Sequence, residues 1–368
     1  MDLRFPESPK RSCRNILLTG STGFVGAYVT RELLEQGHNV YAIVRDEKKL
    51  ADIVRLSPNR LTILTGDLLN DADLETLAHE LRDKVEDLDI VIHMVGGGPL
   101  TSNARFTRAI FDLNHRTTAN LIRLLEGSNK LAHLSLFIYL SSLAAIGTPM
   151  ASDSKRVLYD DTTPCKPTLP YEKAKLATEQ LLEDLTRKHN FRTAIIRFPQ
   201  MYGGHDDAFM QMVKLIRVGV FPLVQDRVGS LPLIHVKDAA NATCAVVTNP
   251  DQLDGNYSVN LICEGSYSYD QVVELVKQAY GKGRTIKFPY LVMYCAILML
   301  EVLFRIIGRP EPLNRKRLIS LTKERVIDSA KFVTAFKFVF QQNVKKFVVH
   351  QPSRTSFLFT KGRFTPQS

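Results

Sequence analysis

The chain is poor in cysteine for its length. Its 368 residues include five cysteines, which stand far apart in the sequence: Cys13, Cys165, Cys244, Cys263 and Cys295. Because their number is odd and their spacing is wide, they form neither a disulfide framework nor a metal-ligand pattern. The sequence therefore predicts no disulfide-stapled scaffold and no metal site, and it favours a reducing compartment, the cytoplasm.

The N-terminus lacks the apolar core segment of a signal peptide. Residues 1–14 are polar and carry scattered charge. We therefore expect residues 1–13 to form a polar tail and not a secretory leader.

Acidic residues become scarce toward the C-terminus. From Arg284 onward the sequence has 16 Lys and Arg against 4 Asp and Glu, and residues 341–368 contain no acid. The net charge of +10 is therefore concentrated in this last segment, and the rest of the chain is close to neutral. This distribution argues against a nucleic-acid-binding core, and we expect residues 331–368 to form a basic tail.

A glycine-rich stretch near the N-terminus has the pattern of a nucleotide-binding turn. Residues 15–26 read N-I-L-L-T-G-S-T-G-F-V-G, and an amphipathic run follows at 27–36. In such a strand, turn and helix, Gly20 makes the turn, Gly23 admits a pyrophosphate, and Gly26 lets the helix pack closely. The spacing is G-x-x-G-x-x-G and not the G-x-G-x-x-G of the standard fingerprint, but the flanking strand and helix are both present. We therefore predict that the N–H groups of this turn face the phosphates of a dinucleotide. The predicted contact residues are Gly20, Ser21, Thr22, Gly23, Phe24, Val25 and Gly26.

The residue after the second predicted strand bears on the choice of cofactor. The strand at 40–44 is followed by Arg45, with Lys48 and Lys49 close by. At this position an acid would bind the ribose hydroxyls of NAD, whereas a guanidinium would pair with the 2′-phosphate of NADP. Arg45 therefore favours NADP(H), with NAD as the alternative; an ordinary solvated basic turn would have the same sequence.

Two further predicted strands end in residues suited to a ligand. The strand at 61–64 leads to Asp67, which is placed either to accept a hydrogen bond from the adenine amino group or to cap the next helix, at 73–84. The strand at 90–94 ends in three consecutive glycines, 96–98. We interpret His93, inside that strand, as a packed and hydrogen-bonded histidine and not a catalytic one.

Strands and helices alternate along this half of the chain. A long helix at 104–125, which carries Asn114, precedes a fifth strand at 136–140. Because such alternation implies right-handed crossovers, we predict an α/β fold with a doubly wound parallel sheet. The length of the chain and its ordinary composition, 45% hydrophobic and 23% charged, allow a smaller lobe beside the main core. Ligands of such sheets bind at the carboxyl ends of the strands, where the residues named above lie.

A serine, a tyrosine and a lysine form the candidate catalytic set. Ser142 follows the fifth strand, and Tyr171 and Lys175 share one face of a helix predicted to begin at Pro170. An ammonium one turn away and a nicotinamide cation would lower the pKa of the phenol from ~10. Tyr171 would then exchange a proton with a substrate hydroxyl, Ser142 would donate to the same oxygen, and Lys175 would hold the nicotinamide ribose. Y-x-x-x-K alone is a weak signal; its strength here comes from its place after the glycine loop and the strand-end serine.

These motifs together resemble the extended branch of the short-chain dehydrogenase/reductase superfamily. The resemblance covers about residues 15–280 and rests on eight segments: T-G-S-T-G-F-V-G (19–26), G-D-L (66–68), V-I-H-M-V (91–95), N-H-R-T-T-A-N (114–120), L-S-S-L-A-A-I-G (140–147), Y-E-K-A-K (171–175), R-F-P-Q-M-Y-G-G (197–204) and H-V-K-D (235–238).

The resemblance implies a layout and a set of site residues. A Rossmann core would occupy 14–200, with 232–262 returning to it, and a smaller substrate-binding α/β lobe would occupy 201–231 and 263–330. Ser142, Tyr171 and Lys175 would be the catalytic triad. The helices at 104–125 and 171–189 would form a homodimer interface. Implied cofactor contacts are Asp67, Leu68, Asn114, Tyr171, Lys175 and Pro199, the last beside the nicotinamide carboxamide.

One local difference bears on the substrate. Sugar-nucleotide members of this branch commonly carry R-D-[FY], whose arginine grips the diphosphate, where this sequence has Leu231-Pro232-Leu233. The change removes a phosphate clamp and leaves apolar residues. With Arg45 and the segment at 140–147, it resembles the 3-beta-hydroxysteroid dehydrogenase and dihydroflavonol reductase relatives. We therefore expect hydride transfer between NADP(H) and a lipophilic, sterol- or flavonoid-like alcohol or ketone. The alternatives are a nucleotide-sugar epimerase or dehydratase with tightly bound NAD, and a cofactor-sensing protein without turnover.

An apolar run near the C-terminus allows three interpretations. Residues 289–307 are interrupted only by Glu301 and Arg305, and a spanning helix needs ~20 predominantly apolar residues. The run is either a core or lid helix over the substrate pocket, a monotopic helix on a membrane aided by the basic residues up to 317, or a span. Peripheral membrane contact through 289–317 is thus one expectation.

Overall fold

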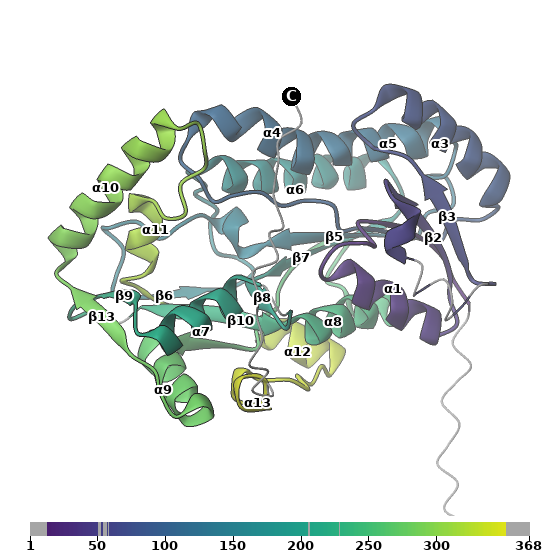
Figure 1. The fold of residues 1–368 in the computed structure, drawn as a ribbon. Coiled ribbons are helices and arrows are strands. Elements are labelled where there is room, and N and C mark those ends of the chain that lie inside the picture. The colour runs from purple at the N-terminus through teal and green to yellow at the C-terminus, as the bar shows by residue number, and fades with distance from the viewer. Residues whose placement is uncertain are drawn as a thin grey trace, which may run out of the picture.

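A seven-stranded parallel sheet forms the centre of the protein (Figure 1). The computed structural model describes residues 13–50, 53, 57, 59–204, 207–227 and 229–350. The strand order is β3-β2-β1-β4-β5-β7-β11, and every neighbouring pair is parallel. This arrangement confirms the predicted doubly wound α/β fold. The strands are β1 (Asn15–Thr19), β2 (Asn39–Val44), β3 (Leu61–Thr65), β4 (Ile90–His93), β5 (Leu136–Ser142), β7 (Arg192–Phe198) and β11 (Tyr257–Leu261).

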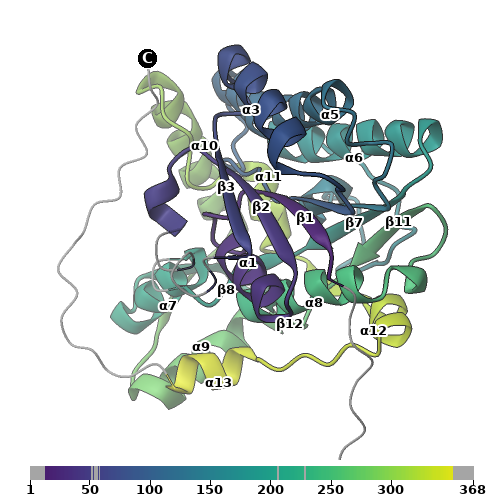
Figure 2. The same cartoon turned by 90° about the vertical axis from the view of Figure 1, so that its right-hand side faces the viewer.

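Helices cover both faces of this sheet, because alternate strand residues point to opposite sides. Ile16 and Leu18 of β1 pack on one side, against α1 (Gly26–Glu35) and α8 (Val236–Thr248). Leu17, between them, packs on the other side. That second layer contains α3 (Asp71–Lys84), α5 (Thr117–Gly127) and α6 (Pro170–Lys188), as Figure 2 shows.

The helix predicted at 104–125 is divided. It begins with a 3₁₀ turn at Ala104–Phe106 and the short α4 (Thr107–Phe111), and a π-helical turn at Asp112–Arg116 separates α4 from α5. The wide turn is stabilised by side chains that bond backward to carbonyl oxygens: Asn114 Nδ2 donates to Ile110 O (2.7 Å) and Thr118 Oγ1 to Asn114 O (2.9 Å). Such π turns are frequent at functional sites.

Smaller sheets and helices form a second lobe beside the carboxyl edge of the main sheet. Segment 232–262, expected to return to the Rossmann core, contributes α8 and β11 to it, whereas most of β10 lies in the smaller sheet. The lobe contains the sheet β12-β10-β8 and the pairs β13-β9 and β14-β6. Their bounds are β6 (Arg156–Tyr159), β8 (Gln200–Tyr202), β9 (Phe221–Val224), β10 (Ser230–His235), β12 (Gly265–Ser268), β13 (Thr285–Phe288), β14 (Glu324–Ile327), α7 (Ala208–Val218), α9 (Tyr269–Tyr280), α10 (Tyr290–Ile306) and α11 (Arg315–Ser320).

The segment after residue 330 is not simply a tail. The boundary expected at 331 falls inside α12 (Ala330–Phe336), whose Phe332 is buried against the main core. Residues 341–350, which we expected to belong to the basic tail, dock on the lobe through α13 (Val344–His350). Both carboxylate oxygens of the buried Asp238 accept from this segment, one from Gln341 N (3.1 Å) and one from Gln342 N (2.9 Å). Burial and these hydrogen bonds hold this part of the segment against the lobe; residues 351–368 lie outside the described part.

The apolar run at 289–307 forms α10 and its flanking residues. Only a narrow stripe of α10 is buried. No helix in the described part of the chain combines the length and apolar character needed to cross a bilayer.

Candidate active site

The glycine loop after β1 has the geometry that a close-packed turn requires. Gly20 has φ +78°, and a Cβ there would lie 2.9 Å from the carbonyl carbon of Met94. A Cβ on Gly26 would lie 2.0 Å from Gly20 O, so only a glycine at this position allows α1 to pack this closely against the turn. Residues 20–26 thus form a tight turn between β1 and α1, at the edge of the sheet where β1 ends.

The outer side of this loop fits a dinucleotide. Thr22, Gly23 and Phe24 are exposed, and among the described residues only Gly20 O would lie within 4 Å of a Cβ on Gly23. The buried Ser21 hydroxyl has no hydrogen-bond partner among the described residues. An open glycine backbone at a helix N-terminus suits a pyrophosphate. Val25 is half-buried beneath the turn.

A second glycine segment, after β4, borders the same edge of the sheet. Gly96, Gly97 and Gly98 have φ values of +152°, +149° and +129°, and no atom of the part of the chain that the structure describes would lie within 4 Å of a Cβ on Gly97. The buried Asn114 clamps this segment: its Oδ1 accepts from Gly97 N (3.0 Å) and its Nδ2 donates to Gly97 O (2.8 Å). Its predicted cofactor contact stays a prediction; in this arrangement Asn114 would act through the backbone of Gly97.

Arg45 and Asp67 lie opposite each other at the ends of β2 and β3. Their side chains form an ion pair at 3.8 Å, and Arg45 remains 73% exposed. Asp67 does not cap α3, because Asn70 does so, with its side chain accepting from Ala72 N and Asp73 N. Asp67 instead accepts from Leu69 N (2.9 Å) in a local turn, so the helix-capping alternative is wrong and the adenine contact remains a prediction.

Ser142 and Tyr171 meet where β5 ends and α6 begins. Ser142 is the last residue of β5, and its hydroxyl also accepts from Ala144 N (3.1 Å). Burial raises the pKa of Tyr171 to about 12, and a hydrogen bond with Ser142 opposes that rise. Lys175 is not among the causes of this shift, because its ammonium bonds elsewhere, and the predicted lowering beside a nicotinamide cation stays a prediction. At neutral pH the phenol is therefore protonated.

Lys175 is buried one turn further along α6. Its Nζ donates to Tyr139 Oη (2.9 Å) and to Leu140 O (3.1 Å), both on β5. Burial lowers the pKa of Lys175 to about 8, while Glu179 opposes this shift. A Cβ on Gly96 would lie 2.8 Å from Nζ, so the ammonium stands directly beside the second glycine segment. The structure thus brings Ser142, Lys175 and Gly96 to one edge of the sheet.

A buried ion pair fixes α6 against the sheet behind these groups. Arg197 Nη2 lies 2.6 Å from Glu179 Oε2, with side-chain exposures of 5% and 2%, and Nε donates to the other carboxylate oxygen (3.1 Å). Ser141 donates to the same carboxylate. The sequence interpretation missed Tyr139, Glu179 and Arg197; the available signal was that Glu179 is four residues after Lys175, on the same helix face.

His93 has the structural role that the sequence predicted. It is fully buried, and its ring nitrogens lie 2.6 Å from Thr19 Oγ1 and 2.9 Å from Thr118 Oγ1. Burial, and to a lesser extent Lys175, lower its pKa to about 3. The ring is therefore neutral and joins β4 to β1 and α5.

The other predicted contacts lie around this edge. Phe24 is 42% exposed, and a Cβ on Gly204 would lie 3.0 Å from its ring. Leu68 is buried, and its carbonyl accepts from Asn120 Nδ2 (2.6 Å). Pro199 is buried between β7 and β8. Within the described residues, no group of three His, Cys, Asp or Glu side chains is placed to hold a metal ion.

Comparison with known proteins identifies the family. The profile of the NAD dependent epimerase/dehydratase family matches residues 16–261, about two thirds of the chain. The chain belongs to this family. A member of the NAD dependent epimerase/dehydratase family with these motifs is an NAD(P)-dependent enzyme of the extended short-chain dehydrogenase type, as the sequence resemblance implied.

Its relatives in the family include two kinds of enzyme. The UDP-glucose 4-epimerase of Erwinia amylovora is 24% identical over 294 residues, which cover 73% of this chain and 83% of that protein. The decarboxylating sterol-4-alpha-carboxylate 3-dehydrogenase of Dictyostelium discoideum is 24% identical over 244 residues, which cover 66% and 70%. The relatives therefore do not decide between a nucleotide sugar and a sterol as the class of substrate.

Solved structures of the family share the fold. The UDP-glucose 4-epimerase of Bifidobacterium longum in complex with NAD+ and UDP has a TM-score of 0.67 and 20% identity, with 91% of this chain and 96% of that chain covered. MoeE5 in complex with UDP-glucuronic acid and NAD has a TM-score of 0.65 and 17% identity, with 91% and 96% covered. At these identities the likeness establishes the fold alone.

Proposed function

We propose that this protein is an NADP(H)-dependent oxidoreductase that acts on a secondary alcohol or ketone of a lipophilic, sterol- or flavonoid-like substrate. The observation that carries the proposal is the convergence of Ser142, Tyr171 and Lys175 at the carboxyl end of β5. When bound, the cofactor would supply or accept the hydride. The glycine loop at 20–26 would hold its pyrophosphate.

The side chains of the triad divide the proton chemistry. The buried phenol of Tyr171, with its pKa raised to about 12, holds a proton that it can donate to a carbonyl oxygen. Ser142, in hydrogen-bond contact with that phenol, would orient the same oxygen. Lys175, one helical turn after Tyr171 and held by Tyr139 and Leu140, would supply the positive charge that stabilises the phenolate left after proton transfer.

The strand β10 supports a lipophilic substrate. At the position where sugar-nucleotide relatives commonly carry an arginine, Leu231 is 7% exposed, and Leu233 is fully buried. This strand therefore offers no guanidinium to a diphosphate. The sterol dehydrogenase among the relatives is consistent with the same substrate class.

Arg45 supports the NADP(H) preference. Its guanidinium is 73% exposed and forms a long ion pair with Asp67, so it is accessible to a 2′-phosphate. We expect Arg45→Ala to raise the KM for NADPH about 10- to 100-fold, since a hydrogen bond to a charged group contributes about 1.5–3 kcal/mol, and to change the KM for NADH little. Steady-state kinetics with both cofactors measure this. Arg82→Ala, an exposed arginine on α3, is the control, and equal changes for NADPH and NADH would contradict the assignment.

A nucleotide-sugar reaction is the second candidate, and one observation favours it. Burial, and to a lesser extent the charge of Arg325, lower the pKa of Arg317. Nε of Arg325 is buried without a hydrogen-bond partner among the described residues. In such a reaction the guanidiniums of Arg317 and Arg325 would receive the diphosphate in place of the missing arginine on β10.

A direct assay separates the two candidates. Purified protein is denatured and analysed by mass spectrometry for retained nucleotide, then assayed for NADPH consumption with sterol-type ketones, flavonoid-type ketones and UDP-sugars. The proposal expects no retained NAD and one NADPH consumed per ketone reduced. Tightly retained NAD with interconversion of a UDP-sugar and no net NADPH consumption would establish the epimerase instead. NADPH binding without turnover of any substrate would indicate a cofactor sensor.

A further inference from the structure

Helix α10 exposes most of its apolar surface. Its buried residues are Met293, Ile297 and Glu301, which repeat every four positions and form one narrow stripe. The exposed apolar side chains on and just after the helix are Leu291 (71%), Val292 (51%), Leu298 (37%), Met299 (67%), Leu300 (36%), Val302 (49%), Leu303 (51%), Ile306 (78%) and Ile307 (50%). Soluble monomers rarely leave such a contiguous apolar surface uncovered.

The one acid of α10 points away from this surface. Glu301 is buried, and its carboxylate accepts from Arg315 N (2.7 Å) and Arg315 Nε (3.0 Å). Arg305 and Arg309, at the end of the helix and just beyond it, are exposed. The outward face of α10 is therefore apolar along its length and basic at one end.

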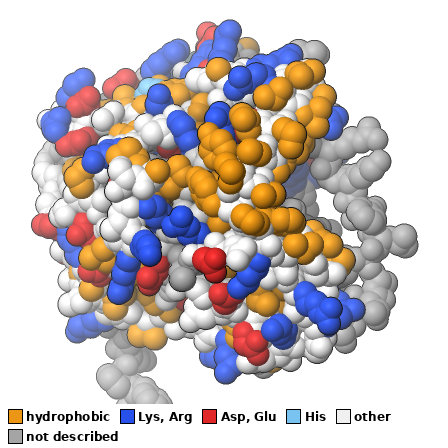
Figure 3. Space-filling view, turned by 90° about the vertical axis from the view of Figure 1, so that its left-hand side faces the viewer, with side chains coloured by type: hydrophobic (Ala, Val, Ile, Leu, Met, Phe, Trp, Pro, Cys, Tyr) orange, Lys and Arg blue, Asp and Glu red, His pale blue; other side chains and the backbone are white. Residues whose placement is uncertain are grey.

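The apolar surface continues onto the neighbouring strands. β13 leads into α10 and pairs with β9, with Ile286 opposite Pro222. Ile286 is 42% exposed, Val220 is 48% exposed, and Val218, at the end of α7, is 75% exposed. Figure 3 shows a broad band of hydrophobic side chains across this side of the protein, with Lys and Arg side chains around it. We call this band, with α10 and these three residues, the apolar face.

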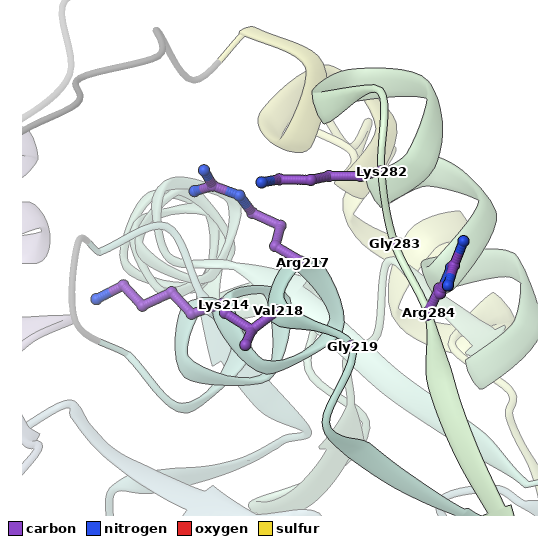
Figure 4. A pocket seen from close by; sticks show the side chains of 7 residues that line it. All are labelled: Lys214, Arg217, Val218, Gly219, Lys282, Gly283 and Arg284. Atoms are coloured by element: carbon purple, nitrogen blue, oxygen red, sulfur yellow. The ribbon is translucent and has the colours of Figure 1, made fainter.

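A basic groove adjoins the apolar face at Val218. It has a volume of about 670 Å³ and is lined by Lys214, Arg217, Val218, Gly219, Lys282, Gly283 and Arg284. In Figure 4, Arg217 and Lys282 extend toward each other from α7 and from the segment before β13, whereas Lys214 and Arg284 extend to either side. Tyr280 supports Arg217, whose guanidinium carbon lies 4.3 Å from its ring centroid. No acid lines the groove among the described residues.

We propose that the apolar face docks on a lipid bilayer that contains anionic phospholipids, with α10 lying in the plane of the interface and the basic groove receiving lipid phosphates. An interfacial helix buries its apolar side at the level of the headgroups and needs no spanning length. Each Lys or Arg near an anionic surface adds to the attraction. The same charges disfavour a second copy of the chain as the occupant, because a two-fold contact across this face would bring two basic surfaces together.

The docked face would adjoin the candidate active site. Just beyond α10, Glu311 accepts from Ser102 N and Ser102 Oγ (2.9 Å), and Asn314 Nδ2 donates to Leu100 O (2.7 Å). Leu100 and Ser102 follow the second glycine segment at 96–98. A lipophilic substrate dissolved in the bilayer would therefore be presented close to that site. The docking itself does not depend on the proposed reaction, because it can be measured without substrate.

Vesicle binding by the full chain tests the inference. We expect the protein to sediment with vesicles of 70% phosphatidylcholine and 30% phosphatidylserine, and to bind pure phosphatidylcholine at least tenfold more weakly. Met299→Glu with Ile306→Glu should lower binding to the mixed vesicles at least tenfold, because it places charge where apolar side chains enter the interface. Lys282→Glu with Arg284→Glu should lower it about tenfold or more, and added salt should reduce this difference.

Matched variants separate docking from general electrostatic attraction. Val339→Glu replaces an apolar side chain that is 74% exposed in the segment between α12 and α13, and Lys188→Glu reverses an exposed charge at the end of α6. Both should bind like the unaltered protein. The inference is overturned if the full chain does not bind anionic vesicles, or if the α10 variant binds as well as Val339→Glu. It is equally overturned if the protein is a dimer that the α10 variant converts to monomers, since a second copy would then cover the face.

Discussion

Tyr171→Phe should lower kcat about 10²- to 10⁴-fold while leaving the NADPH Kd within about twofold of its original value. The substitution removes the one proton that this buried phenol holds at neutral pH, where its pKa is raised to about 12. The ring remains, so the packing at the start of α6 is kept. Rapid-mixing or steady-state kinetics give kcat, and fluorescence titration gives the Kd. Because proton donation belongs to the chemical step and not to cofactor binding, the two quantities should separate.

A tyrosine outside the candidate active site provides the control for this variant. Tyr280→Phe removes a hydroxyl at the end of α9, far along the chain from the triad, and should leave kcat unchanged. The kcat of Tyr139→Phe should lie between those of the other two variants. This substitution removes the hydroxyl that holds the Lys175 ammonium and leaves Leu140 O as the partner of that ammonium. If Tyr171→Phe turned over ketone at the native rate, the catalytic assignment would be lost.

Arg197→Met should lower the free energy of unfolding by about 3–5 kcal/mol, because it leaves the carboxylate of Glu179 buried without its charge partner. The pair is almost completely removed from water and carries two parallel hydrogen bonds. It also joins α6 to β7, and Ser141 joins the same carboxylate to β5. Denaturant titration, analysed with a constant m value, measures the loss.

Two companion variants show whether the loss comes from the unpaired charge. Arg197→Met combined with Glu179→Leu should recover most of the stability, since apolar replacements of a buried pair are often neutral or stabilising. Arg187→Met breaks the exposed pair with Glu183, in which Arg187 is 67% exposed, and should cost less than about 1 kcal/mol. A loss for Arg197→Met as small as that of Arg187→Met would mean that the pair does not hold α6 in place.

The parts of the fold that the sequence predicted are those with local causes. The glycine loop was recognisable because Gly20 and Gly26 lie next to the strand and helix that they join, and the contacts that forbid a Cβ come from within the loop and from β4. The five predicted strands of the main sheet are short apolar runs buried on both faces, and their bounds agree with the prediction within two residues. His93 was placed in the core because its neighbours in sequence are all apolar.

The parts that were missed depend on groups far apart in sequence. Tyr139 lies 36 residues before Lys175, and Arg197 lies 18 residues after Glu179, so neither partnership has a local pattern. In the sequence, Tyr139 is not distinguishable from the apolar residues of the buried strand around it. For the same reason, no local pattern showed that Tyr139 and Leu140 would bind the Lys175 ammonium. The sequence left open whether Asp67 caps α3. Asn70, three residues later, has a side-chain oxygen that can accept the same hydrogen bonds, and it is the cap in the structure.

The hydrogen bonds of Asp238 bear on how this protein is completed during synthesis. Its two carboxylate oxygens accept from Gln341 and Gln342, which follow it by 103 and 104 residues, and burial raises the pKa of this carboxyl while those two donors oppose the rise. Until residues 341–342 have left the ribosome, the start of α8 must hold an acidic group with neither donor in place. The lobe can therefore reach its final packing only late in translation, after the sheet at the N-terminal end has had time to form.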